Sequence, residues 1–95
     1  MNSVNITGQL VTEPDYCFRG LMHVTEFDIE VAVHKRRRDR FHVVAMNDLA
    51  RTARCLLMGA TVAVNGTLRS EPYDMPDRSV WHKTEILAYE LDRLA

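Results

Sequence analysis

A short run of cationic side chains is the feature of this sequence with the clearest chemical meaning. Between His34 and His42 the chain carries five lysine or arginine residues and one aspartate, a formal charge of +4, whereas the whole chain carries −1. Guanidinium groups bind phosphate oxygens in pairs and also stack on flat rings. Phe41 directly follows the run. The segment therefore indicates contact with a polyanion that carries phosphates and flat bases, and we expect the two flanking histidines to face solvent or phosphate.

Two further aromatic side chains have positions that favour base stacking. Tyr73 lies between Pro72 and Asp74 in a polar segment, and Trp81 is the only tryptophan of the chain. We predict that Phe41 and Tyr73 act as stacking platforms, since any base can lie on an aromatic ring. Two alternatives stay open: Phe41 is also suited to the core of a strand, and Trp81 either contacts bases or plugs one end of the fold.

The remaining aromatic and basic residues receive more ordinary roles. We expect Phe18 to pack in the core and Tyr89 to lie in the core or in a subunit interface. Arg51 and Arg54 are expected on the exposed face of a helix. Arg69 and Lys83 lie near the ends of two predicted strands, where they suit either a phosphate contact or a plain surface position.

Length and composition exclude several classes of protein. Ninety-five residues, of which 46% are hydrophobic and 26% charged, suit a single globular domain over residues 1–95. No apolar stretch approaches the roughly 20 residues of a membrane helix, and the first residues lack the apolar core of a signal peptide, so we expect a cytoplasmic protein. Cys17 and Cys55 are far apart, and no histidine has metal-ligand spacing. We therefore expect no enzyme, no catalytic residue, no metal and no cofactor.

Periodicity predicts an all-β chain with little helix. Alternating apolar and polar residues are typical of half-buried strands. They predict strands over 4–10, 26–33, 40–46, 62–68 and 80–91, with a loop over 70–79.

One short helix is expected between the third and fourth strands. Asn47 and Asp48 offer acceptors for the free amides of a helix start, apolar residues recur at helical spacing after them, and Gly59 is a suitable C-terminal cap. This order of elements is that of a five-stranded barrel of the oligonucleotide-binding (OB) type.

Four pieces of sequence resemble a known family in their order and spacing. They are VNITGQL at 4–10, FHVV at 41–44 followed by DLA at 48–50, MGATVAVNGTL at 58–68, and TEI at 84–86. In these pieces the chain resembles the bacterial single-stranded DNA-binding proteins. The resemblance covers residues 2–91 and implies an OB fold that coats single-stranded DNA without reading its sequence, as a homotetramer.

The resemblance also implies site residues. Phe41 and Tyr73 fall on two positions that stack bases in the family, and Met46 falls where a third aromatic is common. Together with the basic residues, the predicted nucleic-acid contacts are Lys35, Arg36, Arg37, Arg38, Arg40, Phe41, Met46, Arg69, Tyr73, Trp81 and Lys83.

The chain also departs from that family. Glu30 stands where a small residue is usual, and Glu26 and Asp28 share its strand face, so carboxylates would repel DNA if they lined the groove. The chain ends at Ala95 without the linker and acidic tip of longer members. We therefore expect a protein that works without recruiting partners in that way, or a shortened form.

Two other functions remain open at this stage. A short chain of this kind also resembles primosomal replication protein N, a dimer that acts in replication restart. The near-neutral charge and the acidic strand face also fit an OB module that binds another protein and no nucleic acid. The expected partners are therefore single-stranded DNA, further copies of the chain, and replication or repair proteins.

Overall fold

Strands dominate the computed structural model, which describes residues 1–95. The elements are β1 (Val4–Leu10), β2 (Asp15–Arg19), β3 (Met22–His34), β4 (Arg37–Met46), α1 (Asp48–Ala53), β5 (Thr61–Asp74) and β6 (Val80–Arg93). The predicted all-β class, with one short helix before the last two strands, is confirmed. No helix is long and apolar enough to cross a membrane.

The strands form one sheet that closes on itself. Its order is β1-β5-β6-β4-β3-β2, and an additional pairing of β1 with β3 completes the ring. All pairings are antiparallel except that of β4 with β6, which is parallel at Val43–Ile86 and Val44–Leu87. Strand β1 pairs with both β3 and β5, whereas β2 pairs with β3 alone, in a hairpin that leaves the barrel. The five strands of the ring, β1, β5, β6, β4 and β3, therefore correspond to the five-stranded OB barrel expected from the sequence.

The core lies inside this ring. Side chains of a strand point to opposite faces in turn, so alternate residues of β3 and β5 are buried within the barrel, as at Phe27 and Ile29, whereas β4 buries the consecutive residues 43–45. Helix α1 covers one end of the barrel, where the buried Thr25 hydroxyl donates a hydrogen bond of 2.7 Å to the carbonyl oxygen of Ala50. The core residues are Leu10, Phe27, Ile29, Val43, Ala45, Ala53, Leu56, Ala60, Val62, Val64, Ile86 and Ala88.

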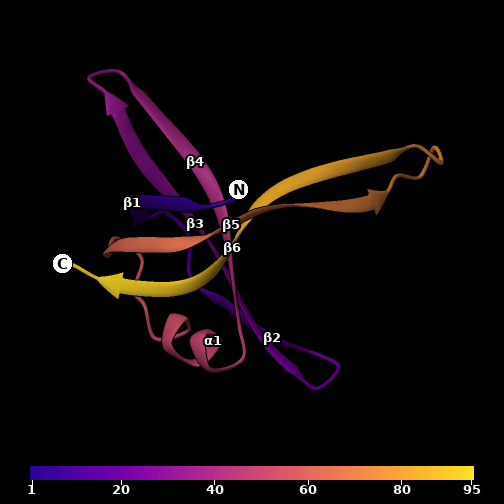
Figure 1. Cartoon of the computed structure of the whole chain (residues 1–95), viewed down its shortest axis with the longest axis horizontal. Coiled ribbons are helices and arrows are strands. Elements are labelled where there is room, and N and C mark those ends of the chain that lie inside the picture. Colours follow the sequence, from indigo (N-terminus) through magenta and orange to yellow (C-terminus); the bar gives the residue numbers. More distant parts are fainter.

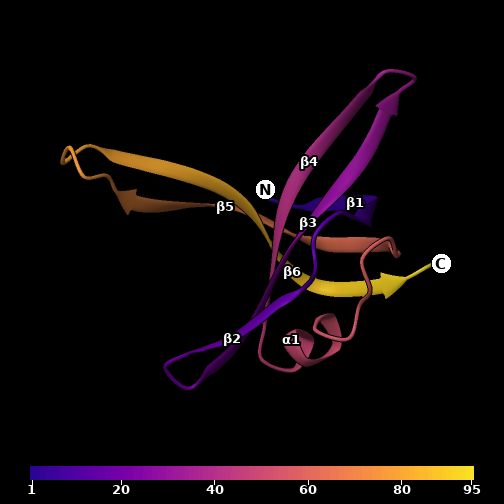
Figure 2. The same ribbon diagram turned by 180° about the vertical axis from the view of Figure 1, so that it is seen from behind.

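Three hairpins extend beyond the barrel (Figures 1 and 2). The β3–β4 hairpin and the β5–β6 arm project in different directions, and the β2–β3 hairpin leaves the barrel beside α1. Outside the barrel each strand has a single neighbour, so these segments are two-stranded ribbons whose side chains have no core to enter.

The loop predicted over residues 70–79 is wrong over the largest number of residues. Strand β5 continues to Asp74, which pairs with Val80, and only a short turn separates the two strands. Pro72 lies within β5, although proline lacks the N–H that a central strand must donate. It is tolerated because β5 has only β6 as a neighbour there.

The strands of the other two hairpins were also predicted too short. Strand β2 was not expected, β3 begins at Met22 instead of residue 26, and β4 begins at Arg37 instead of residue 40. Pairing with a neighbouring strand supplies backbone hydrogen bonds that extend all three segments although their sequences show no regular alternation of apolar and polar residues.

The helix is shorter than predicted, and neither expected cap is present. It ends at Ala53, and the side chain of Asn47 makes no capping hydrogen bond. Gly59 lies well beyond the helix, with a φ of +92°, and its amide donates to the carbonyl oxygen of Leu10 at 2.9 Å. Glycine adopts this positive φ without strain, and the chain can therefore turn at Gly59 into β5. This turn allows Leu56 and Ala60, on either side of it, to be buried in the core.

Some side chains predicted to be buried are exposed. Phe18 is 63% exposed, because β2 lies in a hairpin outside the barrel. Leu68, on the face of the predicted 62–68 strand that was expected to be buried, is exposed because β5 leaves the barrel after Gly66. Tyr89 is 64% exposed, so it is not a core residue.

The departure of the arm requires a glycine at position 66. The ladder between β5 and β6 shifts register between Asn65 and Gly66. A Cβ atom on Gly66 would lie 2.3 Å from the carbonyl oxygen of Leu87, a backbone atom that cannot move aside alone. The register shift and the close approach of the two strands therefore depend on the missing side chain.

We predict that Gly66→Ala lowers the free energy of unfolding by about 3 kcal/mol, the upper end for overpacking. Urea unfolding followed by far-ultraviolet circular dichroism measures it. Ser70→Ala, an exposed change on the same strand, serves as the control and should cost less than about 1 kcal/mol. Equal stability of Gly66→Ala and the wild type would show that the strands do not approach so closely.

Candidate nucleic-acid interface

The basic run forms the tip and one strand of the β3–β4 hairpin. Lys35 and Arg36 make the turn, and the following residues belong to β4. The guanidinium of Arg37 pairs with Asp39 at 3.0 Å, and that of Arg40 pairs with Asp28 at 3.0 Å. The predicted cluster is therefore divided: two of its arginines are neutralised by carboxylates of the protein. Lys35, Arg36 and Arg38 are exposed, form no salt bridge, and stay available to an anion.

The β5–β6 arm carries two of the predicted aromatic residues. Tyr73 and Trp81 are direct partners in the antiparallel register, so both side chains leave the ribbon on the same face. They are 47% and 57% exposed. The indole Nε1 of Trp81 donates a hydrogen bond of 3.0 Å to the hydroxyl of Ser79, which fixes the ring at its edge. Trp81 therefore does not plug the barrel, and the arm presents two rings to solvent.

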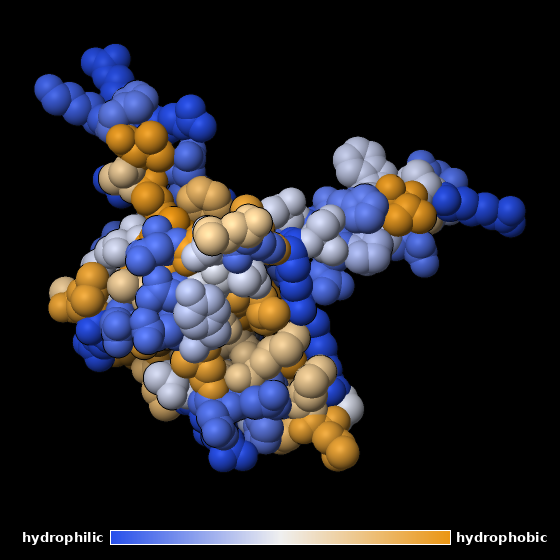
Figure 3. All heavy atoms as spheres, viewed as in Figure 1, coloured by the Kyte–Doolittle hydropathy of each residue, from blue (hydrophilic) through white to orange (hydrophobic).

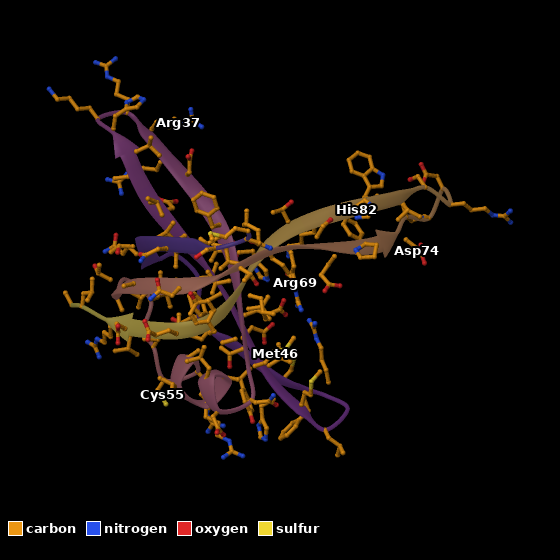
Figure 4. The ribbon with its side chains drawn as sticks, viewed as in Figure 1. Arg37, Met46, Cys55, Arg69, Asp74 and His82 are labelled. Atoms are coloured by element: carbon orange, nitrogen blue, oxygen red, sulfur yellow. The ribbon has the colours of Figure 1, made fainter.

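Phe41 and Met46 lie elsewhere on β4. Phe41 is partly buried, is the register partner of Ile29 and packs against the core, which is the alternative role that the sequence left open. Met46 ends the strand beside the β2–β3 hairpin, at the opposite end from Arg37 (Figure 4). The ten residues of this extended strand place its two ends roughly 30 Å apart. The predicted residues are thus not brought into one patch.

A groove of about 680 Å³ lies between the β2–β3 hairpin and the β5–β6 arm. Tyr73 and Lys83 of the predicted set line it, and Arg69 lies at the base of the arm near its floor. Sequence reasoning missed most of its other residues, because the groove exists only where two hairpins face each other. The complete lining is Arg19, Glu26, Glu71, Pro72, Tyr73, Lys83 and Glu85. Its charges nearly cancel.

A salt-bridge network occupies the floor of this groove and the adjoining outer face of β3 and β4. Glu85 is only 5% exposed and accepts a hydrogen bond of 2.7 Å from the guanidinium of Arg69. Arg69 also pairs with Glu71 at 3.2 Å. Arg19 pairs with Glu26 at 2.9 Å. Of the three carboxylates that the sequence placed on this strand face, Glu26 and Asp28 are therefore paired with cations of the protein, whereas Glu30 forms no salt bridge.

His42 is the centre of the network, although the sequence had placed it toward solvent or phosphate. Its Nδ1 lies 2.6 Å from Asp28, and its Nε2 lies 2.9 Å from Glu26. An ionised carboxylate only accepts hydrogen bonds, so the ring serves both partners when both of its nitrogens donate. His42 therefore acts as a bridge between two carboxylates of β3.

These contacts set the pKa values of the two carboxylates. Partial burial disfavours the charged form of Glu26, but the hydrogen bond from His42 and the positive charge of Arg19 outweigh it, so the pKa lies below its usual value. The same balance, with hydrogen bonds from His42 and Arg40, lowers the pKa of Asp28. Both groups are therefore held in their charged form in the folded protein.

Three potential metal-ligand atoms of Glu26, His42 and Glu85 lie within 4.8 Å of one another. They do not form a suitable cation site. The Nε2 of His42 already bonds Glu26, and the guanidinium of Arg69 sits against Glu85. A divalent ion would have to displace these contacts and would be repelled by the arginine.

We predict that the network makes stability fall in acid. Because the folded-state pKa values lie below the unfolded ones, the carboxylates stabilise the fold above about pH 4, and this contribution is lost as pH falls through their folded-state pKa values. The variant Glu26→Gln with Asp28→Asn should be less stable at pH 7 by about 1 kcal/mol. Its free energy of unfolding should then decline less steeply than that of the wild type between about pH 5 and pH 2.

Urea unfolding at stepped pH makes the comparison. Glu13→Gln, an exposed carboxylate outside the network, controls for the loss of a negative charge. Parallel acid profiles for the double variant and the wild type would contradict the role assigned to these two residues.

The sequence and the fold were compared with those of known proteins. No known family profile matches the sequence, and no curated protein is a close enough match to count as a relative. Among solved structures, the chain is similar to a deletion mutant of the single-stranded DNA binding protein from Thermus aquaticus, with a TM-score of 0.83 and 24% sequence identity. The match covers 100% of this chain and 42% of that protein's length. The chain therefore has, over its whole length, the OB fold found in that single-stranded DNA-binding protein.

Proposed function

We propose that this protein binds single-stranded DNA with little sequence preference. The observation that carries the proposal is the pair Tyr73 and Trp81, exposed side by side in the register of the β5–β6 arm. Large rings on a two-stranded ribbon gain nothing from the core, and unstacked bases are ligands that fit such rings. The similarity of the whole chain to a single-stranded DNA binding protein supports the same function.

The charges support a division of labour between phosphates and bases. Lys35, Arg36 and Arg38 form a cationic tip without internal partners, which suits the phosphate backbone. The groove beside Tyr73 is nearly neutral, and its carboxylates are already paired. It therefore suits bases, which are uncharged, better than phosphates. Phe41 and Met46 remain predicted contacts of lesser weight, since Phe41 packs against the core.

The cellular setting is part of the proposal. We infer a cytoplasmic, nucleoid-associated protein that protects or organises single-stranded DNA in replication, repair or recombination. We also propose that it assembles as a homo-oligomer, for which the exposed Tyr89 of β6 offers an apolar contact. A tetramer favours the general single-strand role, whereas a dimer favours a role in replication restart like that of primosomal replication protein N. Sedimentation equilibrium at micromolar concentration distinguishes them.

The first test measures the phosphate contacts. The wild type should bind a labelled oligo-dT, and log affinity should fall against log salt with a slope near −3 for about four phosphate contacts. Lys35→Gln, Arg36→Gln and Arg38→Gln together should bring that slope to about −1. Arg93→Gln, an exposed cation at the end of β6, is the matched control and should keep the wild-type slope. Fluorescence anisotropy at four salt concentrations measures it.

A second test concerns the arm. Tyr73→Ala and Trp81→Ala should each weaken binding by about 1–3 kcal/mol, the usual value of one stacked base. Binding of the wild type should also quench the emission of Trp81, the only tryptophan. Unchanged affinity in both variants would remove the arm from the site. Absence of wild-type binding at low salt would contradict the proposed function and favour a protein-binding OB module.

A further inference from the structure

A second aromatic and basic surface lies at the other end of the molecule, beside α1. It consists of Tyr16, Phe18, His23, Arg51 and Arg54, and we refer to it as the aromatic–arginine patch. The first three belong to the β2–β3 hairpin, where Phe18 and His23 are register partners. The two arginines extend from the C-terminal part of α1 and the residue that follows it. None of these residues was among the nucleic-acid contacts predicted from the sequence.

The side chains of the patch hold one another in place. The rings of Tyr16 and Phe18 meet edge to face with centroids 5.7 Å apart, and the ring of Phe18 lies 4.6 Å from that of His23. The guanidinium carbon of Arg54 is 4.7 Å above the centre of the Tyr16 ring. A nitrogen of Arg51 lies 3.3 Å from His23 Nε2. The patch is therefore ordered before any ligand arrives, which reduces the entropy lost on binding.

The patch has an exposed aromatic ring and two arginines that no carboxylate of the chain neutralises. The Phe18 ring remains 63% exposed, and the hairpin tip beyond it adds the exposed side chains of Leu21 and Met22. Figure 3 shows hydrophobic atoms at this lower right end, whereas the tip of the β3–β4 hairpin is hydrophilic. Neither Arg51 nor Arg54 forms a salt bridge, in contrast to Arg19, Arg37, Arg40 and Arg69. Because no carboxylate neutralises these two guanidinium groups, and the ring beside them is exposed, both parts of the patch can bind a ligand.

We propose that the aromatic–arginine patch is a second contact site for single-stranded nucleic acid, with a base stacked on Phe18 and phosphates on Arg51 and Arg54. The inference rests on the proposed function and extends it. Arg54 can bind phosphate while it stacks on Tyr16, because the cation–π contact uses the face of the guanidinium and leaves its N–H groups at the edge. A flat ring flanked by cations matches a nucleotide more closely than it matches an acidic side chain, which offers no planar base.

The position of the patch connects it with the groove. Arg19 and Glu26 of the β2–β3 hairpin line the groove, and the patch lies on the opposite face of the same two-stranded hairpin. A nucleic-acid strand that leaves the groove over the hairpin tip therefore reaches Phe18 within a few nucleotides. Oligonucleotides that fill only the groove should not contact the patch, whereas longer ones should.

The test uses the full chain with two oligo-dT lengths, about 8 and about 35 nucleotides, since one OB domain covers about 4–16 nucleotides. Phe18→Ala should weaken binding of the longer oligonucleotide about 5-fold or more and leave the shorter one unchanged. Arg51→Gln with Arg54→Gln should also reduce the salt slope for the longer oligonucleotide by about 1.4. The corresponding lysine variant keeps both charges and should retain that slope. Leu57→Ala, an exposed apolar residue near the same helix, is the control.

Ultraviolet crosslinking gives a readout that does not depend on affinity. The wild type with the longer oligo-dT should yield a crosslink within residues 15–23, identified by mass spectrometry of the digested complex. Thermal melts of each variant establish that the fold is intact. Wild-type affinity in all patch variants, with crosslinks only elsewhere, would overturn the inference while the proposed function stands.

Two further outcomes also decide the matter. Patch variants that bind oligo-dT normally but lose binding to an oligo-glutamate peptide would overturn the inference and assign the patch to an acidic protein segment. If the wild type binds neither oligonucleotide, the proposed function fails, and the inference fails with it.

Discussion

The parallel pairing of β4 with β6 is the contact on which the rest of the structure depends. It joins Val43 with Ile86 and Val44 with Leu87, and with the pairing of β1 to β3 it turns an open sheet into a ring. Inside the ring each strand has a neighbouring strand on both sides. Strands longer than the barrel can continue only as two-stranded ribbons. The three projecting hairpins, and the groove between two of them, follow from that geometric constraint.

The outer face of the barrel shows how this fold can carry carboxylates beside a nucleic-acid surface. Glu26, Asp28 and Glu85 would repel phosphates if they were free. Instead His42 bridges the first two, and Arg69 pairs with the third. Arg40 and Arg69, which the sequence had suggested as DNA contacts, therefore form salt bridges with carboxylates of the protein. Of the cations left without a salt bridge, Lys35, Arg36 and Arg38 lie at the β3–β4 hairpin tip, Arg51 and Arg54 lie beside α1, and Lys83 lines the groove. The charge available for binding is therefore smaller, and more dispersed, than the sequence indicates.

The predicted and observed elements agree where burial determines the pattern. The strands through Ile6, Phe27 and Val62 were found because alternate residues enter the core. The arm after Leu68 was missed because both faces of a two-stranded ribbon are exposed, so its sequence shows no alternation. Strand β2 and the first residues of β3 show no regular alternation either, since the consecutive residues Val24 and Thr25 are both buried. The helix was predicted too long because Leu56 and Leu57 continue its spacing. In the structure the chain reverses after Ala53 so that Leu56 enters the barrel from a turn.

The sequence by itself determined the class of the fold, the position of its helix and the candidate chemistry, because local periodicity and residue type are properties of neighbouring residues. It placed the basic hairpin and Tyr73 correctly on the surface, and it left open whether Trp81 lies there or in the barrel. Only the tertiary structure decided that Tyr73 faces Trp81 across a ladder, that Phe41 packs inward and that Arg37 and Arg40 are neutralised. It also placed the Tyr16 ring in contact with both Phe18 of β2 and Arg54, which follows α1. These relations depend on strand register and barrel closure, which join residues far apart in the chain.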